Sequence, residues 1–167
     1  MDFVSDSLSN GRRIKCLTVA DDFSHECVDV ATDYGISGHY VTRLLDQAAI
    51  FRGYPRAVRT DNGPEFTSRA FMAWAQSHGI RHLLIEPGRP MQNGYIESFN
   101  GKFRDECLNE HWFTSLHHAR VVIDAWRREY NEERPKKSLG GLTPAAYAKT
   151  LAQKSVKLTP DSKAYCY

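Results

Sequence analysis

Residues 57–66 read Ala-Val-Arg-Thr-Asp-Asn-Gly-Pro-Glu-Phe, a short apolar segment that ends at an acid and a turn. The first four residues predict a β-strand that ends immediately before Asp61. The Asn-Gly-Pro run that follows breaks the strand, because Gly and Pro both favour turns over regular structure. Asp61 is therefore expected at the end of a strand, where a side chain can point into a site.

A second acid, Glu97, follows Asp61 with 35 residues between them, on a helix expected from about 92 to 108. Helical spacing places Glu97 on a polar face and predicts a separate apolar face that packs on a sheet. The polar face also holds Asn93, Asn100, Gly101 and Arg104, and the apolar face holds Ile96, Phe99, Phe103 and Cys107. Spacing alone leaves open an ordinary solvated helix face. The alternative is a face that carries Glu97 toward Asp61 and a third acid, Asp2, on the first strand.

The remaining segments alternate between strand and helix patterns. The order predicts a mixed sheet flanked by helices, which is an α/β fold. Strands are expected at 2–5, 14–20, 27–32, 57–60 and 80–85. Helices are expected at 38–52, from Ser68 to Gly79, from Thr114 or Ser115 to about 132, and from 144 to about 152.

Composition limits the classes of protein to which the chain can belong. With 167 residues, 41% hydrophobic and 25% charged, it fits one globular domain. A net charge of +2 is mild, so any DNA-binding residues must be concentrated locally. No apolar run reaches the length of a membrane span. The four cysteines lack metal-binding spacing, which indicates free thiols and a cytoplasmic location.

Longer motifs around the acids resemble the catalytic core of DDE transposases, in particular the bacterial insertion-sequence-three family, which is related to retroviral integrases. The resemblance rests on Asp61-Asn-Gly-Pro-Glu-Phe66, on the 35-residue gap and on the segment from Ile96 to Asn109. It extends over residues 1–148 through 1–6, 18–23, 110–113 and 130–144. The resemblance implies a ribonuclease-H-like fold. It implies an integrase-type core over 1–132. The residue pattern indicates a basic loop and short helix over 133–152 and a flexible tail over 153–167.

The resemblance also implies a function and a catalytic site. Asp2, Asp61 and Glu97 would be the catalytic residues and the ligands of two divalent cations, Mg²⁺ with Mn²⁺ as a substitute. Clustered carboxylates repel one another, and hard oxygen ligands suit these ions. Asp6 competes with Asp2 because both lie on one face of the first strand. The expected reaction is phosphodiester hydrolysis and strand transfer during DNA integration.

Candidate DNA contacts lie in three places. Arg89, Gln92 and Asn93 belong to the loop before the Glu97 helix, and Lys102 and Arg104 continue along that helix. Lys136 and Lys137 form a basic loop, in which Lys136 replaces the His that the family usually has after Arg-Pro. Solvated surface charge is the alternative for these residues. The expected partners are DNA and further copies of this chain, with no membrane and no organic cofactor.

Other acids and the start of the chain have plainer interpretations. Asp21 and Asp22 are expected to stabilise a strand connection, Glu65 to orient the loop after Asp61, and the seven histidines to pack or lie at the surface. The chain starts one residue before Asp2, without the helix-turn-helix region of such transposases. We therefore expect a catalytic fragment or a truncated product. The competing hypothesis is a non-catalytic DNA-binding or dimerisation module derived from a transposase.

Overall fold

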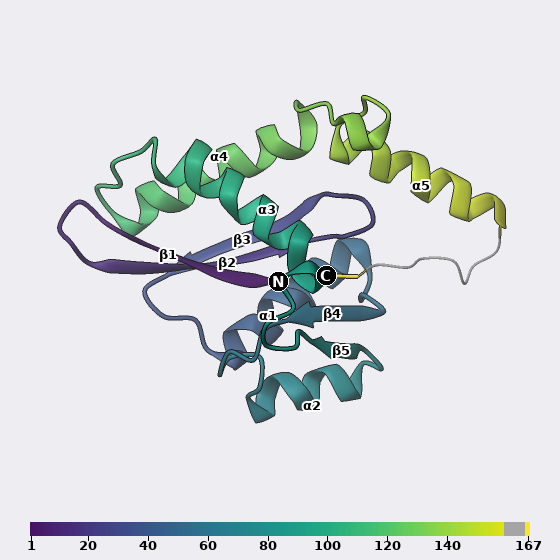
Figure 1. The fold of residues 1–167 in the computed structure, drawn as a ribbon, viewed down its shortest axis with the longest axis horizontal. Coiled ribbons are helices and arrows are strands. Elements are labelled where there is room, and N and C mark those ends of the chain that lie inside the picture. The colour runs from purple at the N-terminus through teal and green to yellow at the C-terminus, as the bar shows by residue number, and fades with distance from the viewer. Residues whose placement is uncertain (159–165) are drawn as a thin grey trace.

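Two sheets form the centre of the computed structural model, which describes residues 1–158 and 166–167 (Figure 1). An antiparallel sheet has the strand order β1–β2–β3, with β1 (Asp2–Ser7), β2 (Arg13–Ala20) and β3 (Cys27–Asp33). Two shorter strands pair in parallel, β4 (Ala57–Thr60) and β5 (Arg81–Leu84). This mixture of antiparallel and parallel pairing between helices confirms the α/β class.

The two sheets meet where β1 begins. The amino group of Met1 donates a hydrogen bond of 2.8 Å to the Arg59 carbonyl of β4. Tyr167 also lies along β4, where its N–H donates to the Ala57 carbonyl at 3.0 Å and its carbonyl accepts the Arg59 N–H. The two ends of the chain therefore lie side by side at this junction (Figure 1). The junction brings the first residue of β1 close to the end of β4.

Helices cover both faces of the antiparallel sheet (Figure 1). Side chains of a strand alternate between faces, so β2 contributes to two apolar clusters. Leu17 and Val19 pack toward α1 (Gly38–Arg52) and α2 (Arg69–Ser77). Cys16 and Ala20 pack toward α3 (Gly94–Phe103) and α4 (Leu116–Glu132). A sheet buried on both faces holds its strand ends in fixed positions.

Serine side chains mark where three of the helices begin. Ser37, Ser68 and Ser115 precede α1, α2 and α4, and each accepts a hydrogen bond from a backbone N–H in the first turn. Such caps satisfy N–H groups that have no partner inside the helix. The prediction that Ser68 is a cap is confirmed, and Ser115 rather than Thr114 caps α4.

The helix expected over 92–108 is present as three successive segments. A 3₁₀ turn (Pro90–Asn93) leads into α3, and a π-helical turn (Arg104–Leu108) follows it. The predicted apolar face is confirmed, because Ile96, Phe99, Phe103 and Cys107 are all buried.

The last helix is longer than the sequence indicated. We expected it to end near residue 152, but α5 (Pro144–Leu158) continues to Leu158 because the added residues include good helix formers. Within the flexible tail predicted over 153–167, residues 159–165 lie outside the described part of the chain. The division into three segments stays a prediction. None of the helices in the described residues is long and apolar enough to cross a membrane.

Helix α4 covers the open edge of β3 at both ends of that strand. Near the start of β3, the Asn131 side chain accepts the Cys27 N–H and donates to the Cys27 carbonyl, both at 2.8 Å. Near its end, Arg120 donates to the Thr32 carbonyl at 2.8 Å and to the Asp33 carboxylate at 2.9 Å. These side chains replace the strand partner that an edge lacks.

We predict that Asn131→Ala lowers the free energy of unfolding by about 2–4 kcal/mol, because the buried N–H and carbonyl of Cys27 lose their partners. Urea unfolding followed by circular dichroism measures the change. Glu132→Ala, at the exposed next position of the same helix, is the control and should leave the midpoint nearly unchanged. Equal midpoints for the two variants would contradict the edge-covering role of Asn131.

Candidate active site

The three acids singled out by the sequence line one cleft. Asp2, Asp61 and Glu97 contribute to a hollow of about 420 Å³. The remaining lining comes from Asn62, Asn93 and the loop over 85–89. Acids that are far apart in the chain therefore line the same space, as the resemblance implied.

Each acid reaches the cleft from a different element. Asp2 is the first residue of β1, and Asp61 directly follows the last residue of β4. Glu97 lies in the first turn of α3, whose apolar face is buried against the antiparallel sheet. The sheet junction and the packing of α3 together bring the three carboxylates to one place.

Protein N–H groups hold the Asp2 carboxylate on both sides. Its Oδ1 accepts the Phe3 N–H at 2.8 Å, and its Oδ2 accepts the Asn100 side-chain amide at 2.9 Å. Burial raises the pKa of Asp2, the Phe3 N–H opposes that rise, and the negative charge of Asp61 adds to it. Asp2 and Asp61 are thus close enough to repel each other.

The turn after β4 holds Asp61 in a similar way. Its Oδ1 accepts the Gly63 N–H at 2.9 Å, which closes a tight turn around the carboxylate. A Cβ atom at position 63 would lie 2.9 Å from that same oxygen, closer than a side chain tolerates. A side chain at position 63 would therefore push the Asp61 carboxylate out of this arrangement. Glu97 is exposed in the cleft.

The donor set fits a hard divalent cation, because three carboxylates line one cleft. Two of them, Asp2 and Asp61, come from strand ends and repel each other, and the third, Glu97, comes from α3. As they stand, however, no three His, Cys, Asp or Glu side chains within residues 1–158 and 166–167 are grouped so as to hold a metal ion. In this arrangement the oxygens of Asp2 and one oxygen of Asp61 face N–H donors of the protein. The metal-ligand role of the triad stays a prediction.

The other acids considered in the sequence lie outside the cleft. Asp6 lines a different hollow, next to Trp112 and Phe113, and not the cleft. Asp21 accepts the Phe23 N–H at 2.9 Å and the Ser24 hydroxyl at 3.0 Å, which confirms its expected role in the strand connection. Asp22 and Glu65 form ion pairs, Asp22 with Arg59 and Glu65 with Lys15.

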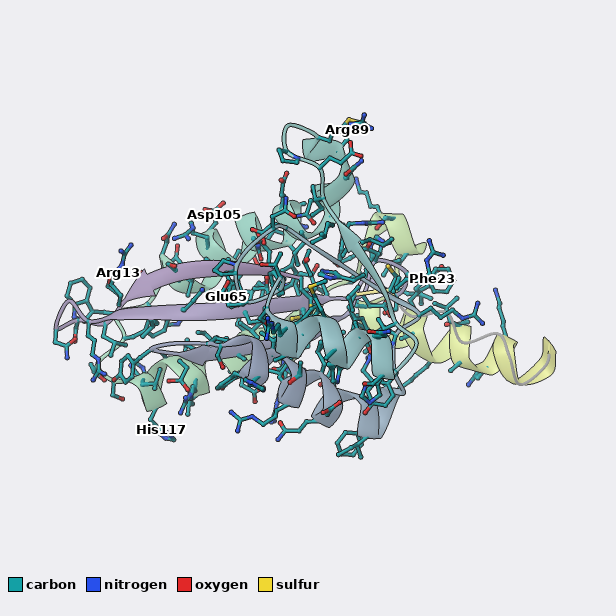
Figure 2. The ribbon with its side chains drawn as sticks, turned by 90° about the horizontal axis from the view of Figure 1, so that it is seen from below. Arg13, Phe23, Glu65, Arg89, Asp105 and His117 are labelled. Atoms are coloured by element: carbon teal, nitrogen blue, oxygen red, sulfur yellow. The ribbon has the colours of Figure 1, made fainter. Side chains whose placement is uncertain are left out.

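The candidate DNA contacts fall into separate groups. Arg89 and Asn93 line the acidic cleft, and Figure 2 shows Arg89 on a loop that projects from the body of the protein. Arg89 pairs with Glu86 at 2.8 Å, and the Gln92 side chain accepts the Glu86 N–H at 3.2 Å, so both organise that loop.

The other candidate DNA contacts do not line the acidic cleft. Arg104 donates to the Ser5 carbonyl of β1 at 3.2 Å. Lys102, Lys136 and Lys137 line a second hollow beside α3. Lys102 and Arg104 therefore lie in different surroundings on the helix. DNA binding by each of these residues stays a prediction.

Family models for the integrase core domain match residues 1–90 and 78–144. The chain belongs to the integrase core domain family.

Several relatives of this integrase core come from bacterial insertion elements. It is 74% identical over 148 residues to an uncharacterized 39.2 kDa protein of insertion element IS476 from Xanthomonas euvesicatoria, covering 89% of this chain and 43% of the relative. It is 66% identical to an uncharacterized 31.7 kDa protein of IS407 from Burkholderia multivorans, covering 89% and 53%. A putative transposase of IS150 from Escherichia coli is 25% identical, covering 86% and 52%. The chain thus spans about half the length of these relatives.

Solved structures confirm the predicted fold. The catalytic core domain of HTLV-2 integrase, in complex with magnesium, has a TM-score of 0.63 at 20% identity, covering 87% of this chain and 94% of that one. The catalytic core domain of BIV integrase has a TM-score of 0.67 at 16% identity, covering 92% and 95%. The ribonuclease-H-like fold is therefore confirmed. The relation to the retroviral integrase superfamily is confirmed by the family models and the insertion-element relatives, while the insertion-sequence-three assignment stays a prediction.

Sequence reasoning placed Asn100 on the polar face of its helix but assigned it no role. Its amide donates to Asp2, and its carbonyl oxygen accepts the Thr18 hydroxyl at 2.8 Å. Thr18 lies opposite Asp2 in the pairing of β1 with β2, so a chain of side chains ties the helix to both strands. The spacing of three residues from Glu97 is the one signal in the sequence that points to Asn100.

We predict that Asn100→Ala weakens Mn²⁺ binding by about ten- to a hundredfold, the usual effect of losing a residue that orients a metal ligand. Calorimetric titration measures the affinity, and thermal unfolding checks that the fold persists. Asn109→Ala, at an exposed position farther along the same segment, is the matched control. Equal Mn²⁺ affinities for the two variants would show that Asn100 does not position Asp2 for metal.

Proposed function

We propose that this integrase core is the catalytic domain of a DNA transposase, which hydrolyses and transfers phosphodiesters during DNA integration. One observation carries the proposal, namely that Asp2, Asp61 and Glu97 line a single cleft in a chain of this family. The similarity to insertion-element proteins favours a transposase over other members of the fold.

Asp2, Asp61 and Glu97 are the residues that would hold two Mg²⁺ ions, with Mn²⁺ as a substitute. When bound, such ions supply an activated water or 3′-hydroxyl and stabilise the leaving oxygen. The carboxylates of Asp2 and Asp61 repel each other, so a cation between them is favoured by charge. The Asn100 amide would keep the Asp2 carboxylate oriented for its role as a metal ligand.

DNA is the proposed substrate, and the loop over 85–93 is the proposed guide of the strand that enters the cleft. Arg89 is exposed on this loop, and Asn93 stands at the start of α3 beside Glu97. The HTLV-2 core has been solved in trimeric and dimeric forms, which supports the proposal that this chain acts as a homo-oligomer. We place the protein in the bacterial cytoplasm, on the DNA that it rearranges.

The direct test is strand transfer on a duplex that carries a recessed 3′-hydroxyl, in Mg²⁺ or Mn²⁺. We predict that Asp61→Asn reduces the yield of joined product by about a hundredfold or more, since a lost metal ligand removes several kcal/mol of transition-state stabilisation. Joined strands are quantified on denaturing gels, with removal of the cation by a chelator as a second way to abolish the product.

Asp6→Asn is the matched control, because Asp6 lies on the same strand as Asp2 but lines a different hollow. It should keep the activity of the unsubstituted chain. Equal yields from the unsubstituted chain and Asp61→Asn would overturn the assignment and favour the non-catalytic module that binds DNA or dimerises.

A further inference from the structure

A second hollow, of about 410 Å³, lies beside α3 next to the acidic cleft. Ser98 and Lys102 of α3 form one wall, while Glu97 and Asn93 line the cleft. The opposite wall is the basic loop that follows α4, with Lys136 and Lys137. One helix therefore separates an acidic space from a basic one.

Three lysines, Lys102, Lys136 and Lys137, line this hollow, and within residues 1–158 and 166–167 no carboxylate is among its lining groups. The nearby acids are already engaged, since Arg134 pairs with Glu106 and, at 2.9 Å, with Glu129. Lys102 and Lys137 are exposed, and the ion pairs found among the described residues include neither of them. The hollow thus presents uncompensated positive charge, which favours an anion.

Lys136 is held in place rather than free in solvent. Its ammonium donates to the Tyr130 hydroxyl and lies 4.1 Å from the centre of that ring and 5.7 Å from the Tyr95 ring. Burial and the nearby charge of Lys102 lower the pKa of Lys136 to about 8. An anion in the hollow would offset the repulsion between the ammonium groups of Lys102 and Lys136.

Aromatic and hydroxyl groups make the floor rigid. The Tyr95 hydroxyl donates to the His25 carbonyl at 2.9 Å, and the two rings are 4.6 Å apart. His25 has a positive φ of 61°, unusual for a residue other than glycine, and its carbonyl is fixed by this contact. Ser98 and Ser138 add hydroxyls at the rim, which donate readily to phosphate oxygens.

We infer that this hollow binds one backbone phosphate of the DNA strand whose neighbouring bond lies in the acidic cleft, an inference that rests on the proposed function. Lys102, Lys136 and Lys137 neutralise the phosphate. Contacts of this kind position a strand without reading its sequence. Lys136 thereby takes a defined task at the position where the resembling family has His.

The distance between the two sites suits a DNA strand. Five residues separate Glu97 from Lys102, which corresponds to about 7.5 Å along a helix with a rise of 1.5 Å per residue. A DNA strand has one phosphate per about 3.4 Å of its axis. The bound phosphate is therefore expected within a few nucleotides of the bond that reacts.

The test compares DNA binding of the unsubstituted chain with Lys102→Gln/Lys137→Gln, whose exposed side chains can be replaced without disturbing the fold. Binding is followed by the fluorescence anisotropy of a labelled random-sequence DNA duplex over a range of salt concentrations. A chelator is present to remove divalent cations, so that the DNA is bound without being cleaved. We expect about tenfold weaker binding at ~0.1 M salt, and a slope of log affinity against log salt that is smaller by about 1. Lys136→Gln should weaken binding similarly, and Lys136→Arg should preserve it.

The matched control is Arg43→Gln/Arg69→Gln, which removes two positive charges from α1 and α2 on the other face of the sheet. Affinity and slope should stay as in the unsubstituted chain. An equal loss of DNA affinity in this control would show that the effect comes from the overall charge of the protein, and would overturn the inference. An unchanged salt slope in Lys102→Gln/Lys137→Gln would also overturn it.

A further arm replaces DNA by inorganic phosphate and follows thermal unfolding. A phosphate-dependent rise in Tm that Lys102→Gln/Lys137→Gln lacks, with unchanged DNA affinity, would assign the hollow to a free phosphate and overturn the DNA assignment. Asp61→Asn keeps the two proposals apart, because it should bind DNA normally in chelator while losing strand transfer. If Asp61→Asn joined strands normally, the catalytic proposal would fail even with the phosphate site intact.

Discussion

The burial of one face of α3 is the constraint on which the rest of the structure depends. Ile96, Phe99 and Phe103 pack into the cluster between the antiparallel sheet and α4. Because a helix repeats every 3.6 residues, fixing this face also fixes the directions of all the others. Glu97 then lines the acidic cleft, and Lys102 lines the basic hollow. A shift of this helix would move both sites together.

The second constraint is the junction between the two sheets. Hydrogen bonds of Met1 and Tyr167 to β4 place the start of β1 beside the strand that ends before Asp61. The side chain of Asn100 then connects Asp2 to Thr18 on β2. Asp2 is therefore held by its own strand, by the neighbouring strand and by α3, although it is the second residue of the chain.

Charge is arranged locally rather than over the whole protein. The net charge is only +2, yet carboxylates gather on one side of α3 and ammonium groups on another. At physiological ionic strength, charges are screened over about 8 Å, so charged groups elsewhere on the protein act only weakly on these two neighbouring sites. A chain of mild overall charge can thus attract cations at one site and phosphate at the next.

The sequence by itself determined the α/β class, the strand that ends at Asp61 and the two faces of the helix carrying Glu97. These features follow from local periodicity and turn chemistry, which need only neighbouring residues. The resemblance to a known family, carried by the motifs around the acids, also selected the three acids that share the cleft.

Only the tertiary structure decided which distant residues meet. It placed Asp2 rather than Asp6 in the cleft, linked Asn100 to Asp2, turned Arg104 toward Ser5, and set Lys136 opposite Lys102. The end of α5 was placed too early, near residue 152, because sequence patterns locate the ends of helices less reliably than their presence. Contacts across many residues depend on how whole elements pack, and no periodicity in the chain records that packing.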